Sequence, residues 1–431
     1  MRSQVDPSNA GERQLSMLSS GLSLFSGKGL AMLLGFGYWV AAANLYEEHI
    51  VGLVGAAISG ILLVGQLSVL GLESSIVLTY REYAERRTAL FNTAFSLVAL
   101  ASFVASIGLL LVMVAMQGDL AQIATNPGLA LLFVLMGTFA GVMTVQDQMS
   151  MALRRGDQVI PRNVTNGIAS IVPLLIIAAM GAVRGGAAVL FGSWIFGSFS
   201  GIALGVLQMR RLASPYHFRP GIDREIGPAI VRTGIPNHVL TLTERIPVFV
   251  TPLIITEVLS PTANAHWYVV WMAAWVTLVA ARSLASALLA EASNNPDQLS
   301  SHTWRALRGM LVIGALGATA TVLLAPHVLA ILGNSYSAEG TAPLRLLVLS
   351  FAPYSVLMAY FGVCRVSRRL QEANILGVFM ACALIGATAT AASRGLIWVA
   401  GSWVAVTAFF GLIAGARLYR ILQVIPEEAQ V

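Results

Sequence analysis

Apolar runs of about 20 residues or more recur along the whole sequence, from Met17 almost to its end. As an α-helix, each run is long enough to cross the ~30 Å hydrocarbon layer of a membrane. Only 11% of the 431 residues are charged, whereas soluble proteins carry about 25%. The sequence therefore predicts an all-α membrane protein.

We predict about twelve membrane-spanning helices. The polar stretch Met1–Ser16 lacks a short apolar core followed by a small-residue cleavage site, so we expect no removable signal peptide and a first helix that is retained. The predicted spans are Met17–Leu45, Ile50–Tyr80, Ala89–Gln117, Pro127–Leu153, Val159–Val183, Ala187–Met209, Gly234–Leu259, Ala263–Leu289, Leu307–Leu332, Pro343–Cys364, Ile375–Ala392 and Leu396–Ala416.

The basic residues divide unevenly between the two sides that these helices define. If the N-terminus lies inside, twenty of the 26 basic residues fall in inside segments, and three (Arg184, Arg345 and Arg394) fall outside. Because Lys and Arg in short loops are held on the cytoplasmic side, this asymmetry predicts that both termini are cytoplasmic. The pI near 9.6 then reflects topology, and we expect no nucleic-acid partner.

The longest predicted inside segment divides the chain into two sets of six helices. In it Ile222, Ile226 and Ile230 recur every four residues, which fits a surface helix, and a plain linker is the alternative. The predicted division is an N-terminal tail at 1–16, a six-helix bundle at 17–209, a linker at 210–233, a second six-helix bundle at 234–416 and a C-terminal tail at 417–431.

The two sets of helices share features in the same order. Lys28 and Arg245 stand 217 residues apart, and so do His49 and His266. Such matches indicate a parallel internal repeat, although evenly spaced helices alone would give some similarity. We therefore predict two pseudo-symmetric six-helix bundles, an arrangement in which transporters place the substrate site between the bundles near mid-depth.

Three charged residues lie deep in the predicted helices. Lys28, Glu244 and Arg245 each stand about ten or eleven residues, or roughly 16 Å, from the inside start of their helix. A charge at mid-bilayer costs about 3 kcal/mol, so each must face a partner or a water-filled cavity. Four other charged residues are expected near the inside interface, where long side chains reach water: Glu73, Asp147, Arg282 and Glu291.

The predicted seventh helix is polar along one face and contains prolines. Pro247 and Pro252 should kink it just beyond mid-depth, and glycines around Lys28 make the first helix bendable as well. Both helices fit a gate that lines an aqueous cavity; alternatively, Glu244 forms a structural ion pair with a cation on a neighbouring helix, and the glycines only allow close packing. The polar face consists of Asn237, Thr241, Glu244 and Thr251.

Tryptophans recur every four residues on the predicted eighth helix. Trp267, Trp271 and Trp275 share one side, and Arg282 continues it seven residues later. Tryptophan faces can stack on sugar rings and an arginine can bind a phosphate. Aromatic residues near the outer interface more often form a belt that faces lipid, which is the interpretation we favour.

Motifs of common enzyme classes are absent from the sequence. It has no P-loop, no Gly-x-Ser-x-Gly and no His-Glu-x-x-His. The two cysteines, Cys364 and Cys382, give neither a disulfide framework nor a metal site. Glu47 and Glu48 in the first outside loop could act as the base of a lipid-linked glycosyltransferase, but the outside loops are too short to build an acceptor site. We expect no enzyme and no cofactor.

Several stretches share a recognisable pattern of a helix, a short outer loop and a small-residue helix that ends in a polar cluster. They are Leu45–Gly55, Leu70–Ser75, Ser260–Tyr268, Leu289–Glu291 and Leu324–Tyr336. Together they resemble the Wzx-type polysaccharide flippases, whose superfamily also includes the multidrug and toxic-compound extruders and the lipid II flippases. The resemblance covers nearly the whole chain, but its patterns are diffuse.

The resemblance implies roles for the deep charges. Basic residues of the central cavity are thought to hold the lipid-linked diphosphate in relatives, and by position this role passes to Lys28 and Arg245, and less directly to Arg282. Lipid II flippases carry two further helices and more basic residues in the first helix, so a single Lys28 favours the polysaccharide branch. Drug extruders usually present cavity carboxylates, and Glu244 is the one at mid-depth here.

We therefore expect a flippase of the bacterial inner membrane. It would move a polyprenyl-diphosphate-linked oligosaccharide or a related glycolipid by alternating access, among membrane lipids and with glycosyltransferases or a polymerase of the same pathway as partners. An ion-coupled multidrug exporter and, less so, a lipid-linked glycosyltransferase are the alternatives. The expected substrate-binding residues are Lys28, Asn237, Thr241, Glu244, Arg245, Trp271, Trp275 and Arg282.

Overall fold

The computed structural model describes residues 32–180, 186–213, 216–294 and 298–428. Within these ranges the regular elements are all helices. Eleven of them are long and apolar enough to cross a membrane, and Met32–Leu45 forms a shorter apolar helix ahead of them. The model confirms the prediction of an all-α membrane protein with about twelve spans.

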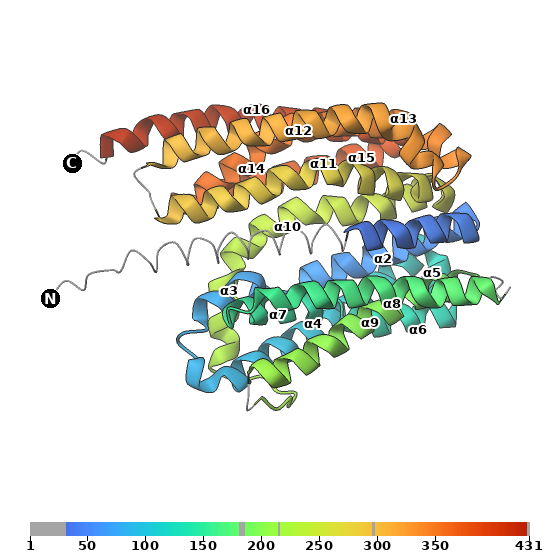
Figure 1. The fold of residues 1–431 in the computed structure, drawn as a ribbon, viewed down its shortest axis with the longest axis horizontal. Coiled ribbons are helices and arrows are strands. Elements are labelled where there is room, and N and C mark those ends of the chain that lie inside the picture. The colour runs from blue at the N-terminus through green and yellow to red at the C-terminus, as the bar shows by residue number, and fades with distance from the viewer. Residues whose placement is uncertain (1–31, 181–185, 214–215, 295–297, 429–431) are drawn as a thin grey trace, which may run out of the picture.

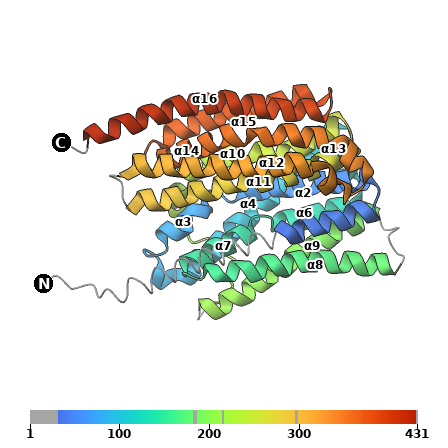
Figure 2. The same ribbon diagram turned by 45° about the horizontal axis from the view of Figure 1, so that its top comes forward.

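The helices form two groups that are separated by one long helix. Figure 1 shows α2 to α9 below and α11 to α16 above, with α10 running obliquely between them. The view in Figure 2 keeps α15 and α16 at one edge and α8 and α9 at the other. We call the segment from Met32 to the end of α9 the N-terminal half, and α10 to α16 the C-terminal half.

The N-terminal half contains eight α-helices after the helix 32–45. They are α2 Glu48–Ser68, α3 Leu72–Thr79, α4 Arg87–Met116, α5 Ala121–Thr125, α6 Pro127–Thr138, α7 Val142–Ala152, α8 Val159–Ala179 and α9 Gly186–Leu212. The C-terminal half contains α10 Ile226–Val258, α11 Pro261–Asn294, α12 Leu299–Ala330, α13 Asn334–Leu347, α14 Phe351–Val366, α15 Leu370–Ala392 and α16 Leu396–Glu428.

The second predicted span is broken where the two halves meet. Instead of one helix over Ile50–Tyr80, α2 ends at Ser68 and α3 begins at Leu72. Gly71 between them has a φ of 82°, and a Cβ there would lie 2.3 Å from the carbonyl carbon of Gly234 on α10. The two glycines let α3 and α10 approach backbone to backbone, which an apolar run in the sequence does not reveal.

The linker is shorter than predicted, because α10 begins eight residues before Gly234, at Ile226. Its start is capped by Asp223, whose Oδ1 accepts from the backbone N–H groups of Glu225 (3.0 Å) and Ile226 (3.1 Å). These two bonds, together with the Arg86 guanidinium, hold the pKa of Asp223 below its ordinary value. Ile226 and Ile230, which fitted a surface helix, are instead buried residues of α10.

The two ends of the bundle differ in charge. We call the end with the connections after α3, α7, α9 and α14 the Arg-rich end. These connections hold eight arginines (Arg81, Arg86, Arg154, Arg155, Arg219, Arg224, Arg368 and Arg369), whereas the connections at the opposite end hold two (Arg184 and Arg394). The opposite end, with the connections after Leu45, α4, α8, α10, α12 and α15, is the Arg-poor end and lies on the right in Figure 1.

Candidate functional site

A polar cavity of about 320 Å³ lies between the two halves. It is walled by α2 of the N-terminal half and by α10 and α11 of the C-terminal half, the helices that pack most closely across the division. Its charged lining residues are Glu244 and Arg245 on α10 and Arg282 on α11. Together with Trp271 and Trp275, the cavity lining therefore contains five of the predicted site residues.

Glu244 is an almost fully buried carboxylate held by two arginines. Its Oε2 accepts from Nη1 of Arg282 at 2.9 Å, and its Oε1 accepts from Nη2 of Arg365 at 3.2 Å. The Glu244 side chain is 4% exposed, against 30% for Arg282 and 27% for Arg365. Both carboxylate oxygens of Glu244 therefore have cationic partners on neighbouring helices, as the ion-pair alternative for this residue predicted.

Arg282 was expected near the inside interface, because it stands about 20 residues along the predicted eighth helix from its outside start. In the structure α11 begins at Pro261, so the rise from that end to Arg282 is about 32 Å and the expected depth is unchanged. What the sequence did not show is that Arg282 lines the cavity and pairs with Glu244.

Arg245 lines the same cavity but has no ion pair or side-chain hydrogen bond with any residue that the structure describes. Its nearest balancing charges are the Glu73 and Glu244 carboxylates, which act on it without direct contact. A guanidinium carries five N–H donors in a planar fork. Arg245 therefore presents unused donors beside the cavity, as an anion-binding group would.

The tryptophans on α11 are packed inside the protein. Trp267 is fully buried, and Trp271 and Trp275 are half-buried residues of the cavity wall. The ring centroids of Trp267 and Trp271, and of Trp271 and Trp275, are 6.3 Å apart in stacked pairs, and Trp403 lies 4.7 Å from Trp271. The favoured interpretation as a lipid-facing belt is wrong, because helices on both sides cover this face of α11.

Other predicted residues lie outside the cavity lining. Asn237 and Thr241 are half-buried on α10, and the Thr241 hydroxyl donates to the backbone carbonyl of Asn237 at 3.2 Å. Lys28 lies outside the described residues, and nothing is described of the Glu291 side chain. Asp147, which was expected at the interface, forms a 2.7 Å ion pair with Arg162.

An apolar cavity of about 700 Å³ adjoins the polar one. It lies where the helix 32–45 meets α11 and α12, and it is lined by residues such as Leu33, Val276 and Leu324. Met272 and Trp275 border both cavities. A polar chamber and an apolar chamber thus share one wall.

Contacts between the halves close the Arg-poor end. The Asn264 amide donates to the carbonyl of Gly52 at 2.8 Å, and the Asn44 amide donates to the carbonyl of Ile331 at 3.1 Å. Glu48 at the start of α2 approaches Nε2 of His266 at 3.2 Å and accepts from the Ser335 hydroxyl. The polar cavity is therefore covered on this side.

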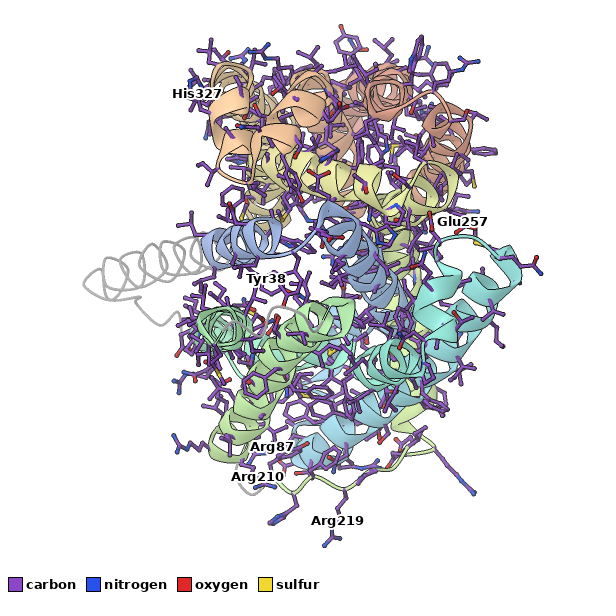
Figure 3. All side chains as sticks on the ribbon, turned by 90° about the vertical axis from the view of Figure 1, so that its right-hand side faces the viewer. Tyr38, Arg87, Arg210, Arg219, Glu257 and His327 are labelled. Atoms are coloured by element: carbon purple, nitrogen blue, oxygen red, sulfur yellow. The ribbon has the colours of Figure 1, made fainter. Side chains whose placement is uncertain are left out.

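A further contact at the Arg-poor end comes from α10. The Oε2 atom of Glu257 accepts from the backbone N–H of Leu120 at 3.1 Å, just before α5. Figure 3 looks at the molecule from this end and shows Glu257 between the C-terminal half and the connection that carries α5. This bond adds to the closure and joins α10 to the N-terminal half.

Two arginines of the structure were not expected to have a role. Arg365 was assigned to an inside loop because its predicted helix ended at Cys364, but α14 continues to Val366 and the side chain reaches Glu244. Arg162 is fully buried and donates to Ser150 (3.1 Å), Gln208 (3.1 Å) and Asp147. Arg365 and Glu244 stand 121 positions apart. A single sequence contains no pattern that predicts such a pair.

No protein-family model matches this sequence, and no curated protein does. Among solved structures, the chain is similar to an inward-facing multidrug resistance MATE family transporter of the MOP superfamily, with a TM-score of 0.72 and 14% identity over 94% of this chain and 99% of that one. An outward-facing transporter of the same description gives a TM-score of 0.64 at 15% identity, over 94% and 95% of the chains.

A further similar structure is a MOP superfamily transporter from Pyrococcus furiosus, whose description is a reversed polarity of the binding pocket that suggests a different function. It gives a TM-score of 0.63 at 15% identity, over 94% of this chain and 95% of that chain. At these identities the likeness concerns the fold. The chain has the fold of MATE family transporters, over nearly its whole length.

Proposed function

We propose that this protein is a flippase that moves a polyprenyl-diphosphate-linked oligosaccharide, or a related cell-envelope glycolipid, across the bacterial inner membrane by alternating access. The observation that carries the proposal is the cationic polar cavity beside an apolar one. Arg245 and Arg282 would bind the diphosphate, because guanidinium groups form charge-assisted hydrogen bonds to phosphate oxygens. The apolar cavity beyond Met272 and Trp275 would take the lipid chain.

The tryptophans would serve the sugar part of this substrate. Trp271 and Trp275 lie in the cavity wall within one helical turn of each other. Flat aromatic faces suit the apolar faces of sugar rings. Glycosyltransferases or a polymerase of the same pathway would supply and consume the substrate, and Lys28 stays a predicted second phosphate ligand.

The orientation of the transport cycle follows from the arginines. If the Arg-rich end and both termini are cytoplasmic, as the basic residues predict, the closed Arg-poor end faces outward. The described conformation would then be the one that accepts substrate from the cytoplasmic leaflet. Opening outward requires loss of the contacts that Glu48 and Glu257 make across the halves.

A multidrug exporter is the second candidate, and the names of the similar structures favour it. A drug cation would need a free carboxylate in the cavity, whereas both oxygens of Glu244 are bound by arginines. The description of the Pyrococcus furiosus structure suggests that the charge of the pocket varies within this fold. The positive cavity therefore leads us to prefer an anionic substrate.

The proposal is tested by transport in reconstituted liposomes. Translocation of a polyprenyl-diphosphate-linked glycan should fall at least about tenfold in Arg245→Ala and in Arg282→Ala, since each removes a charge-assisted phosphate contact of roughly 1.5–3 kcal/mol. Arg308→Ala, which removes an exposed arginine of α12, is the matched control. An active Arg245→Ala, Arg282→Ala double variant would remove the proposed site.

The alternatives have their own measurements. Resistance to cationic compounds on overexpression, lost in Glu244→Gln, would support the drug exporter in place of the flippase. Sugar transfer by the purified protein, lost when Glu47 and Glu48 are changed, would support the glycosyltransferase.

A further inference from the structure

A small cavity of about 30 Å³ lies beside the polar cavity, on the side of the C-terminal half. Its walls come from α10, α11, α14, α15 and α16. It shares four lining residues with the polar cavity, namely Glu244, Val248, Trp271 and Trp275. Its other lining residues with hydrogen-bonding side chains are Ser350, Tyr354, Trp403 and Thr407. The small cavity therefore lies within the C-terminal half, behind residues that line the polar cavity.

Trp403 of α16 brings a buried donor to the small cavity. The residue is 7% exposed, and its Nε1 has no hydrogen-bond partner among the residues that the structure describes. Its ring packs against Trp271, with 4.7 Å between the ring centroids. Because a buried N–H without a partner destabilises a fold, such groups are normally satisfied by another protein group or by ordered water. The indole of Trp403 therefore calls for an acceptor that the described side chains do not supply.

Glu244 of α10 brings acceptors to the same cavity. A carboxylate offers about four lone-pair sites, and Arg282 and Arg365 each donate one described bond to it, one to each oxygen. The Ser350 and Thr407 hydroxyls each donate to a backbone carbonyl at 2.6 Å, so their oxygens can accept as well. The small cavity thus has acceptors for a donor that lies within it.

This mixture of groups decides what can fill the small cavity. A cation would face the N–H of Trp403 and the two guanidinium groups bound to Glu244, and an anion would face the Glu244 carboxylate. A group that both accepts and donates, such as a water or a hydroxyl, suits both kinds of partner. A cavity needs roughly 10–15 Å³ to admit a water molecule. The volume of about 30 Å³ therefore fits one water, or two at most.

We propose that the small cavity binds an ordered water molecule that accepts from Nε1 of Trp403 and donates to the Glu244 carboxylate. The water joins α16 to α10 behind the Trp271 ring, which Trp403 covers. This site goes beyond the proposed function and does not depend on it, because all the groups that hold the water come from the protein.

The test is a structure of the full-length protein in lipid nanodiscs, without substrate, at a resolution that shows ordered waters. We expect a peak within hydrogen-bond distance of Nε1 of Trp403 and of a carboxylate oxygen of Glu244. Because no substrate is present, such a peak cannot come from a sugar hydroxyl. If no peak lies between these two groups, the proposal is wrong.

A second data set distinguishes water from an ion. Rubidium bromide replaces sodium chloride in the buffer, and both of its ions scatter more strongly than water. An unchanged peak supports water, whereas a stronger peak shows that the small cavity binds an ion and overturns the proposal.

A variant tests the role of the indole N–H. Trp403→benzothienylalanine puts sulfur in place of Nε1–H at nearly the same shape, so it removes the donor without opening space. The peak should then lose most of its occupancy. The same replacement at Trp398, an exposed residue of α16, is the matched control and should leave the peak unchanged. A peak that keeps its occupancy in the Trp403 variant would show that Nε1 does not hold the water, against the proposal. Since transport is not measured, none of these outcomes alters the proposed function.

Discussion

The two halves of the molecule share one kind of ionic group and differ in a second. In the N-terminal half, Arg162 of α8 joins Asp147 of α7 to Gln208 of α9 at the Arg-rich end. In the C-terminal half, Glu372 of α15 joins Tyr360 of α14 to Arg417 of α16 in the corresponding helices. We call these two groups the N-bracket and the C-bracket. Each half thus ties its last three helices together with one central ionic side chain, of opposite sign in the two halves.

The C-terminal half has a second charged cluster, formed by Glu244, Arg282 and Arg365. This cluster joins α10, α11 and α14, and two of its members, Glu244 and Arg282, line the polar cavity, whereas the brackets tie together the last three helices of each half. We expect the brackets to stabilise each half, and the proposed function assigns the cluster at the cavity to ligand binding. In the N-terminal half the predicted counterpart of Arg245, which adjoins Glu244 in the sequence, is Lys28, and Lys28 lies outside the described residues.

The largest expected effect on stability is loss of the N-bracket. Arg162 is 0% exposed, so Arg162→Ala leaves Asp147 and Gln208 without their buried donor and should lower the free energy of unfolding by roughly 3–5 kcal/mol. Chemical unfolding in detergent measures this change. Arg308→Ala at an exposed position should change it by less than about 0.5 kcal/mol. Equal effects at the two sites would show that the N-bracket does not stabilise its half.

Disrupting the contact between the halves at Gly71 should lower the free energy of unfolding by an intermediate amount. Gly71→Ala places a methyl group against the backbone of Gly234 at a positive φ, which should cost roughly 2–3 kcal/mol. Gly108→Ala is the matched control, because a Cβ there meets nothing within 4 Å and the helix gains up to about 1 kcal/mol. If the halves are held by their own brackets, the costs of Gly71→Ala and Arg162→Ala should add within about 0.5 kcal/mol in the double variant. Strong non-additivity would contradict the division into two separately stabilised halves.

The C-bracket should contribute less than the N-bracket, because it is more exposed. The side chains of Arg417 and Glu372 are 43% and 28% exposed, against 0% for Arg162. Arg417→Ala should therefore cost no more than about 1 kcal/mol in the same unfolding measurement. If Arg417→Ala lowered the free energy of unfolding as much as Arg162→Ala, solvent exposure would not explain a difference in stability between the two brackets.

The sequence predicted the membrane-spanning helices, but it predicted the contacts of their charged side chains only in part. Apolar runs decide where the spans lie, because each span must cross the same membrane thickness. Helical depth selected Glu244 and Arg245, and the structure places both in the cavity lining. The four-residue spacing of the tryptophans placed Trp271 and Trp275 on one face, but it did not show that Trp403, from a distant helix, would cover that face. Partners on other helices depend on how the helices pack, which no local pattern specifies.

Two further differences between the predicted and the observed structure also arise from contacts between helices. The break at Gly71 exists because another backbone approaches there, and the bond from Arg365 to Glu244 exists because α14 ends close to Glu244. Both depend on contacts between segments far apart in sequence. A side chain as long as arginine can also reach about a helical turn beyond its own backbone, so its depth in the sequence is not the depth of its charge.

The smallest expected effect concerns the start of α10, where the two halves are joined covalently. Asp223 accepts from the N–H groups of Ile226 and Glu225 and from Arg86 at 2.6 Å, which lowers its pKa in the folded protein. Because the folded pKa lies below the unfolded value, the stabilisation is present above about pH 4 and is lost as the pH falls through the folded pKa. The unfolding midpoint of Asp223→Asn should therefore lie slightly below that of the wild type at pH 6 and approach it as the pH falls toward 3. If the difference in unfolding midpoint between the two proteins stayed constant over this pH range, Asp223 would stabilise the protein through its hydrogen bonds alone. The ion pair between Asp223 and Arg86 of the N-terminal half would then contribute nothing.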